Sequence, residues 1–267
     1  KFYNLDALKD YKWYWRIEPG VRYTCAITYD PFVEMARREK VYGYTVALWE
    51  EPKTCPGLFR AVDDYRVDKG IPAGPMWNAM VDASWKPWPL RKLMAWLRAA
   101  HTDGNGDGWN LCHYWSNFEI ADLDFFRGER YQELFGHLDR SGGFYDERWG
   151  DAPVHSLAVH LLLEPGKLHH FSDIGYDHKP FYQCPGNAPG GQLEEEELEK
   201  SIFGEGKYSP ETEGTIGCRC ECNHHRKKRN NRAICLGRLQ EPATAAANRM
   251  GFMDRFWGRY PYAIGVA

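Results

Sequence analysis

Apolar and polar residues alternate with two different periods along the first seventy residues. The aromatic stretch YKWYWRIE is typical of a β-strand, and the breaker pair Pro19-Gly20 ends it. Asp30-Pro31 is typical of a helix start, because Asp accepts hydrogen bonds from free backbone N–H groups and Pro fits the first helical position. The pattern predicts strands at 11–18, 21–28 and 41–48, and helices at 31–39 and 54–67. This alternation indicates an α/β fold.

The pattern changes between residues 70 and 108. Residues 70–89 are rich in Pro and Trp and predict a long surface loop, whereas 90–101 are amphipathic and predict a helix. The sequence HTDGNGDG at 101–108 predicts a plain turn. It is similar to part of a calcium-binding loop, but the Glu that an EF-hand pattern requires is missing.

The second half begins with clear elements and ends without them. A strand followed by a loop is expected at 111–119, helices at 128–138 and 151–163, a short strand at 167–171, and loops as far as 191. Residues 193–200 (LEEEELEK) predict a solvated acidic helix face or a linker. Residues 218–232 are rich in cysteine and then basic, and we expect poor order there.

Composition sets broad limits on function. The 267 residues suffice for a large single-domain core, and the net charge of −3 gives no global field that recruits nucleic acid. The longest apolar run, 157–163, is interrupted by His160 and is too short to span a bilayer. The eight cysteines fit either a few disulfides in a secretory lumen or scattered thiols, and their pairing cannot be read from the sequence.

Chemistry-bearing residues are densest between 111 and 185, where carboxylates, imidazoles and aromatic rings are interleaved. Aromatic faces cover the C–H faces of a sugar and carboxylates accept from its hydroxyls, but a polar loop over a core has the same composition. Glu119 stands in WSNFEI between large apolar residues. It is therefore either paired structurally or held ready for catalysis, because an unpaired buried carboxylate is costly.

Three further residues are candidates, each with a plain alternative. Glu18 precedes Pro19-Gly20 at a strand end, where a carboxylate can bind a divalent metal or simply face solvent. His178, in the loop GYDHKP, is either a ligand for Mn or Zn or a surface residue. Asp151 is expected to cap a helix, and a sugar contact requires its second oxygen to remain free.

A third kind of site is suggested by the cysteines and histidines near the C-terminus. The C-x-C spacing differs from that of usual zinc sites, and the basic stretch HHRKKRNNR is more typical of a solvated tail than of a nucleic-acid contact. The residues concerned are Cys218, Cys220, Cys222, His224, His225 and Cys235.

Long strings of the sequence resemble one known family. YWRIEPGVRY, HYWSNFEIADLDFFR, GGFYDERWGDAPVHS and HHFSDIGYDHKPFYQCP occur in the order found in fungal Golgi α-1,2-mannosyltransferases, glycosyltransferase family 15. The resemblance implies a GT-A-like mixed sheet flanked by helices. It implies transfer of mannose from GDP-mannose to the 2-hydroxyl of a mannoside on a glycoprotein or glycolipid, with retention and with Mn²⁺, in protein glycosylation and cell-wall mannan synthesis. Nucleic acid is not an expected partner.

The resemblance also assigns roles. It implies that Glu18 and His178 bind the metal and that Glu119 lies beneath the anomeric carbon, either as nucleophile or as stabiliser of a same-face displacement. Asp151 corresponds to a sugar-contacting aspartate. The neighbouring candidates for substrate contact are Tyr114, Trp115, Arg148 and Trp149.

The sequence departs from the family pattern in three places. The nucleotide-binding βα region expected upstream of 11–18 is truncated, and the Golgi membrane anchor of a lumenal domain is expected upstream as well. Residues 70–108 resemble an insert in a partial catalytic domain at 1–217. Residues 218–267 form an atypical tail. An alternative is therefore a mannoside-binding remnant of the family without catalytic activity.

Overall fold

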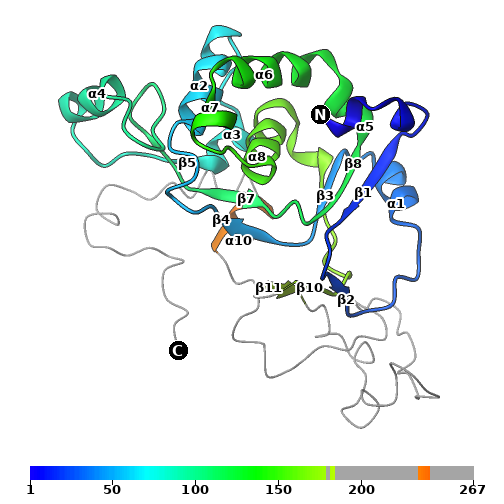
Figure 1. The fold of residues 1–267 in the computed structure, drawn as a ribbon. Helices are drawn as coiled ribbons and strands as arrows, with labels where there is room; N and C mark the ends of the chain where they lie inside the picture. Colours follow the sequence, from blue (N-terminus) through cyan, green and yellow to red (C-terminus); the bar gives the residue numbers. More distant parts are fainter. Residues whose placement is uncertain (179–180, 184–233, 241–267) are drawn as a thin grey trace, which may run out of the picture.

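The protein is a mixed α/β structure built on a four-stranded sheet (Figure 1). The computed structural model describes residues 1–178, 181–183 and 234–240. The sheet order is β1 (Trp13–Ile17), β8 (Phe118–Asp122), β3 (Tyr42–Tyr44) and β9 (Leu168–His170). The first two pairings are antiparallel and β3 pairs with β9 in parallel. The mixed sheet flanked by helices agrees with the predicted fold class.

Smaller strand pairs extend the structure around this sheet. β10 (Tyr176–His178) lies between β2 (Arg22–Tyr23) and β11 (Phe181–Gln183), β4 (Ala47–Trp49) pairs with β7 (Cys112–Tyr114), and β5 (Val81–Asp82) pairs with β6 (Gly108–Trp109). The strand predicted at 41–48 is therefore split into β3 and β4, and the one at 21–28 shrinks to two residues. The loop predicted after 171 was wrong where β10 and β11 form, because β10 pairs with β2, which is distant in sequence, as well as with the neighbouring β11.

The helices begin largely where the sequence signals place them. Asp30 caps α1 by accepting from the backbone N–H groups of Phe32 and Val33 at 2.8 and 3.3 Å, as predicted. Residues 2–4, 6–8 and 165–167 form single 3₁₀ turns. The helices are α1 (Pro31–Arg37), α2 (Leu58–Asp68), α3 (Pro75–Met80), α4 (Trp88–Trp96), α5 (Leu123–Arg127), α6 (Glu129–Arg140), α7 (Gly143–Asp146), α8 (Asp151–Leu162) and α10 (Ile234–Gln240).

Both faces of the central sheet are covered, because successive side chains of a strand point to opposite sides. Ala121 faces the larger core, which also contains residues of α2, α3, α6 and α8. Ile120 faces a smaller core with Met35 of α1 and Phe171. Every residue of α8 after Asp151 is buried, so this helix is the centre of the larger core.

The long surface loop predicted at 70–89 was wrong, because part of this segment is core. Pro75 occupies the first turn of α3, where its missing N–H group costs nothing, and Met76, Trp77 and Met80 are buried. Trp77 stacks on Phe59 with 5.2 Å between ring centroids. The turn predicted at 101–108 is present, and Asp103 organises it by accepting from the backbone of two residues that follow.

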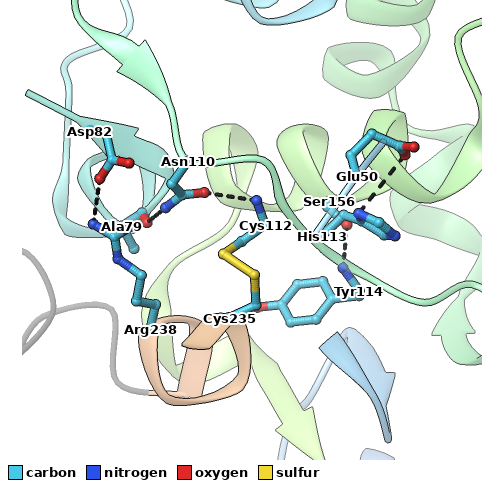
Figure 2. Close-up of a disulfide and its surroundings, with 10 residues drawn as sticks. All are labelled: Glu50, Ala79, Asp82, Asn110, Cys112, His113, Tyr114, Ser156, Cys235 and Arg238. Atoms are coloured by element: carbon cyan, nitrogen blue, oxygen red, sulfur yellow. Dashed lines mark hydrogen bonds and ion pairs between the residues drawn. A yellow bond between two sulfur atoms is a disulfide. The ribbon is translucent and has the colours of Figure 1, made fainter. Parts of the chain in front are cut away.

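A disulfide attaches the C-terminal helix to the domain (Figure 2). Cys235 of α10 is bonded to Cys112 of β7, and Arg238 forms an ion pair with Asp82 at 2.7 Å. Residues 234–240 thus form a packed helix within a tail expected to be poorly ordered. The acidic stretch 193–200 and the segment 218–232 lie outside the described residues. Among the described helices, none has the length and apolar character needed to cross a membrane.

Candidate active site

A cluster of charged side chains lies where β1 ends and α8 begins. Arg16 and Glu18 are two residues apart on β1 and the turn after it, so they share one face, and Arg16 Nε donates to Glu18 Oε1 at 2.9 Å. The same guanidinium forms an ion pair with Asp151 Oδ2. Ser116 donates its hydroxyl to that Asp151 oxygen at 3.2 Å. Arg16 therefore connects two of the predicted site residues.

Asp151 is not the helix cap that the sequence predicts. Gly150 occupies the capping position, and Asp151 is the first helical residue, with its carboxylate turned toward Arg16 and Ser116. Both described contacts use Oδ2, so Oδ1 has no partner among the described residues. Asp151 therefore keeps the free second carboxylate oxygen that a sugar contact requires.

Glu119 is fully buried on β8 and receives three hydrogen bonds. Tyr42 donates its hydroxyl to Oε2 at 2.6 Å, the Tyr14 hydroxyl donates to Oε1, and His155 Nδ1 lies 3.0 Å from Oε2. Burial raises the pKa of Glu119, but His155 and the two hydroxyls outweigh it and leave this pKa below its ordinary value. The cross-strand neighbour of Glu119 on β1 is Arg16, so both belong to one face of the sheet.

His178 is fixed at the end of β10 by two neighbours from the loop between β7 and β8. Its ring stacks on Trp115 with centroids 5.1 Å apart, and the side-chain amide of Asn117 lies 2.8 Å from Nδ1. The β2–β10 register pairs Arg22 with Asp177 and so points His178 toward Val21, the last residue of the turn that starts at Glu18. The topology thereby brings both predicted metal ligands to one end of the β2–β10 pair.

The side chains of Glu18 and His178 carry donor atoms that suit Mn²⁺. Carboxylate oxygen and imidazole nitrogen are both accepted by this ion, and neither Glu18 Oε2 nor His178 Nε2 has a contact among the described residues. The amide nitrogen of Asn117 faces Nδ1, so in this arrangement Nδ1 accepts and Nε2 carries the ring proton; a metal at Nε2 would require the other tautomer, with the Asn117 amide turned so that its oxygen accepts from Nδ1. The described part of the chain has no cluster of three or more metal-binding side chains. Two protein donors would leave most positions to phosphate oxygens and water.

A comparison with protein families matches residues 1–189 to the family described as glycolipid 2-alpha-mannosyltransferase. The chain belongs to this family. An O-glycoside alpha-1,2-mannosyltransferase homolog of Schizosaccharomyces pombe is 39% identical over 83% of the chain and 48% of the relative. The glycolipid 2-alpha-mannosyltransferase of Saccharomyces cerevisiae is 44% identical over 69% of the chain and 37% of the relative. This mannosyltransferase family member therefore spans about half the length of the curated relatives it matches, or less.

Solved structures of mannosyltransferases share its fold. Core-mannan synthase A from Aspergillus fumigatus, in its Mn/GDP form, matches with a TM-score of 0.58 and 43% identity, over 69% of the chain and 47% of that structure. The mannosyltransferase Ktr4p from Saccharomyces cerevisiae in complex with GDP matches with a TM-score of 0.59 and 37% identity, over 69% and 44%. The family match runs from residue 1 to residue 189, and the interpretation of residues 70–108 as an insert stays a prediction.

Three predicted substrate-binding residues are placed differently from the cluster around Arg16. Tyr114 is fully buried, and its hydroxyl lies 2.9 Å from His160 Nε2 in the larger core. Trp149 is buried against Gly143 and donates its indole N–H to Glu147 at 2.8 Å. This leaves neither Tyr114 nor Trp149 an open ring face for a sugar. Arg148 is exposed and has a positive φ of 56°.

Sequence reasoning missed the residues that hold the site together. Arg16 was detectable, because strand alternation places it on the face of Glu18. His155 gave no such signal, since it lies on a helix 36 residues after Glu119 and only the packing of α8 on the sheet joins them. Asn117 and Ser116 likewise act through partners that are distant in sequence.

Proposed function

We propose that this chain is part of a retaining α-1,2-mannosyltransferase that transfers mannose from GDP-mannose to the 2-hydroxyl of a mannoside. The observation that carries the proposal is the convergence of Glu18 and Asp151 on Arg16, with His178 at the same end of the β2–β10 pair. Membership of the family and the Mn/GDP form of a structural relative support it.

In this proposal Glu18 and His178 would hold Mn²⁺, which when bound neutralises the diphosphate of the donor. Arg16 orients Glu18 and restrains Asp151 at the same time, so the two carboxylates keep a fixed separation. The free oxygen of Asp151 accepts from a sugar hydroxyl. Trp115 holds the His178 ring in place by stacking.

Glu119 would supply negative charge near the anomeric carbon. Its lowered pKa keeps the carboxylate ionised at neutral pH, which a role as nucleophile or as stabiliser of a cationic transition state requires. Because Glu119 is completely buried and hydrogen-bonded at both oxygens, the described structure supports a stabilising charge beneath the polar cluster, with Arg16 as the adjacent residue on β1.

The proposed location is the lumenal side of the Golgi membrane. The disulfide between Cys112 and Cys235 supports an oxidising lumen, because such bonds rarely persist in the cytosol.

The test is transfer of radiolabelled mannose from GDP-mannose to methyl mannoside with Mn²⁺. It is run on the 267-residue chain and on the longest open reading frame that contains it. Glu18→Gln and His178→Ala should lower the Mn²⁺-dependent affinity for GDP at least about tenfold, whereas Glu39→Gln, with an exposed carboxylate, serves as the control. Absence of transfer by the longer protein, with or without metal, would refute the proposal.

A second candidate is a mannoside-binding protein without catalytic activity, which the limited coverage of the relatives favours. Calorimetry separates the two candidates. Binding of mannoside without Mn²⁺-dependent affinity for GDP supports the binding protein, and measurable affinity for GDP supports the transferase.

A further inference from the structure

Helix α4 carries the main exposed apolar surface of the described chain. Six of the thirteen large hydrophobic residues that are exposed lie between 85 and 97. Trp88 is 69% exposed and Trp96 is 78% exposed, and the others are Trp85, Leu90, Leu93 and Leu97. In Figure 1 this helix lies at one end of the molecule, far from β1. An apolar surface concentrated in this way marks an interaction site more often than scattered exposed residues do.

The helix exposes the face that a soluble helix would normally bury. At 100° per residue, one arc of the helix surface holds only exposed residues, in the order Trp88, Lys92, Trp96, Pro89, Leu93, Leu97 and Leu90. The opposite side carries Arg91, Met94 and Ala95, which are half-buried or buried against the domain. Only Lys92 interrupts the apolar arc, so packing among the described residues does not account for this sequence.

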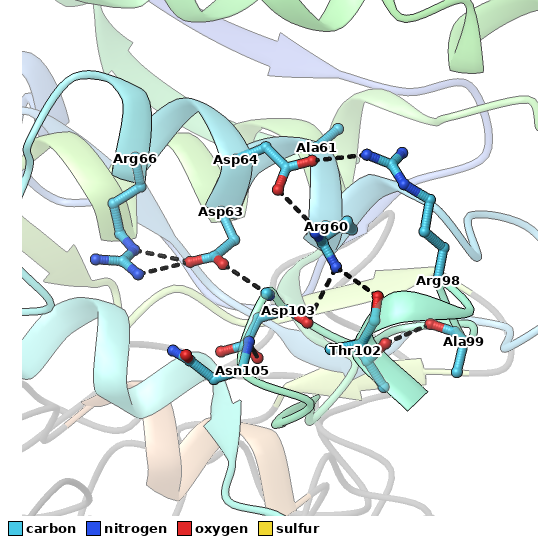
Figure 3. A network of polar contacts seen from close by, with 12 residues as sticks. Arg60, Ala61, Asp63, Asp64, Arg66, Arg98, Ala99, Thr102, Asp103 and Asn105 are labelled. Atoms are coloured by element: carbon cyan, nitrogen blue, oxygen red, sulfur yellow. Dashed lines mark hydrogen bonds and ion pairs between the residues drawn. The ribbon is translucent and has the colours of Figure 1, made fainter. Parts of the chain in front are cut away.

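Polar contacts hold α4 in this orientation, and Figure 3 shows one of them, the ion pair of Asp64 with Arg98 just after the helix. From α2, Arg60 donates to the Ala95 carbonyl at 3.0 Å and Asp64 forms an ion pair with Arg98 at 3.2 Å. On the inner side, Arg91 forms an ion pair with Asp107 at 3.0 Å. The outward apolar face is therefore a fixed feature of the fold.

The turn between α4 and β6 packs closely against the helix. Gly106 has a φ of 79°, and a Cβ atom on it would lie 2.4 Å from the Arg91 carbonyl oxygen. Only glycine fits this close approach. Asp63 of α2 accepts from the Gly104 N–H group at 3.0 Å and so ties the same turn to the domain.

The charged side chains of the segment that carries this face are all basic. Residues 83–102 contain no Asp or Glu, although the whole chain has a net charge of −3. Arg91 and Arg98 are paired within the domain, which leaves Lys86 and Lys92 beside the exposed tryptophans. Lys86 lies 5.4 Å from the centroid of the Trp85 ring. Tryptophan, leucine and lysine together are typical of helices that lie in the headgroup region of a bilayer.

We propose that the outer face of α4 docks on the surface of a bilayer that contains anionic phospholipid. The tryptophan and leucine side chains enter the headgroup region, and Lys86 and Lys92 pair with lipid phosphates or carboxylates. A second copy of the chain is the poorer occupant, because it would bring two sets of lysines face to face. The proposal does not depend on the transferase activity.

The experiment measures flotation of the 267-residue chain with vesicles of phosphatidylcholine, with or without phosphatidylserine. We expect binding to the anionic vesicles, reduced at least about tenfold by the double substitution Trp88→Ser/Trp96→Ser. Lys86→Glu/Lys92→Glu should remove the preference for phosphatidylserine. The matched control is Trp49→Ser/Tyr145→Ser, which replaces two aromatic residues that are 54% and 75% exposed elsewhere. That variant should bind as the unsubstituted chain does.

Two outcomes would overturn the proposal. One is flotation that is absent, or that none of the α4 substitutions changes. The other is a dimer by light scattering that Trp88→Ser/Trp96→Ser dissociates, which would make a second copy the occupant. The replaced side chains are exposed, so unchanged circular dichroism and melting temperature of each variant establish that folding is intact.

Discussion

At the scale of single residues, His155 compensates the negative charge of Glu119, which is fully buried in the core. Removing one partner of a buried pair leaves the other without compensation, at a cost of about 3–5 kcal/mol. His155→Gln should therefore lower the free energy of unfolding by roughly this amount at pH 8, measured by urea denaturation. Tyr42→Phe, which removes a weaker contributor, should have a smaller effect in the same direction.

The pH dependence separates charge from packing in this prediction. In the unsubstituted chain, the lowered pKa of Glu119 adds stability that is present above its ordinary pKa and is lost as pH falls through the folded value. Without His155 that pKa rises, so protonation relieves the buried charge sooner. The deficit of His155→Gln should thus narrow between pH 8 and pH 5. An equal deficit at both values would indicate lost packing alone.

Asp151 shows why residue roles are hard to read from a motif. Asp before a helical pattern is usually a cap, and the sequence predicted one. The structure instead uses Asp151 to bind Arg16, which is 135 residues away. No local pattern contains that partner. Glu18 and His178 were each metal candidates with a plain alternative, only the resemblance joined them in one metal site, and their roles stay predictions.

At the scale of elements, α3 buries a tryptophan whereas α4 exposes one, so substitutions of the two should differ in their effect on stability. Trp77 is buried and stacked on Phe59, so Trp77→Ala should destabilise the protein by about 3–5 kcal/mol. Trp88 is exposed, and Trp88→Ala should change stability by less than about 0.5 kcal/mol. Urea denaturation of the two variants measures the contrast. Similar effects of both would contradict the assignment of α3 to the core.

A buried histidine of helix α8, His160, makes the protein less stable in acid. Burial lowers the pKa of His160 to about 4, although a hydrogen bond to the Met76 carbonyl opposes that shift. Below the ordinary value of 6.5 the unfolded chain takes up a proton that the folded chain refuses, so stability falls as pH falls. We expect a loss of about 1.4 kcal/mol per pH unit between 6.5 and 4 from this residue.

Thermal melting across that range checks the prediction. His160→Gln should be less stable at pH 7, because Tyr114 and Met76 lose a partner, but should show a shallower decline toward pH 4. A decline as steep as that of the unsubstituted chain would show that His160 is not the group that takes up the proton.

The elements that the sequence predicted are those with local signals. The aromatic strand at 11–18, the capped helix at Asp30 and the turn at 101–108 each depend on neighbours within a few residues, and each forms. The segment 70–89 was misread because its prolines and glycines are typical of loops. Its burial depends on Phe59 of the preceding helix and on α8, which is far along the chain, so no pattern within the segment shows it. Strands β2 and β10 were shortened or missed for the same reason.

At the scale of the whole molecule, the bond between Cys112 and Cys235 joins positions 123 residues apart. Because the cross-link restricts the unfolded chain, Cys235→Ser should lower the free energy of unfolding by about 2–5 kcal/mol. Cys112→Ser and the double variant should show the same loss, since any of the three removes the bond. A double variant that loses much more than either single one would point to packing of α10 instead.

The same bond also keeps the two ends of the segment between Cys112 and Cys235 covalently joined. A protease that cuts once at any peptide bond between residues 112 and 235 produces two polypeptides that remain covalently joined. Such a nicked protein would migrate as one band in a denaturing gel without reductant and as two bands with it. Helix α10 would stay attached to the domain through purification even when the connection in sequence is broken.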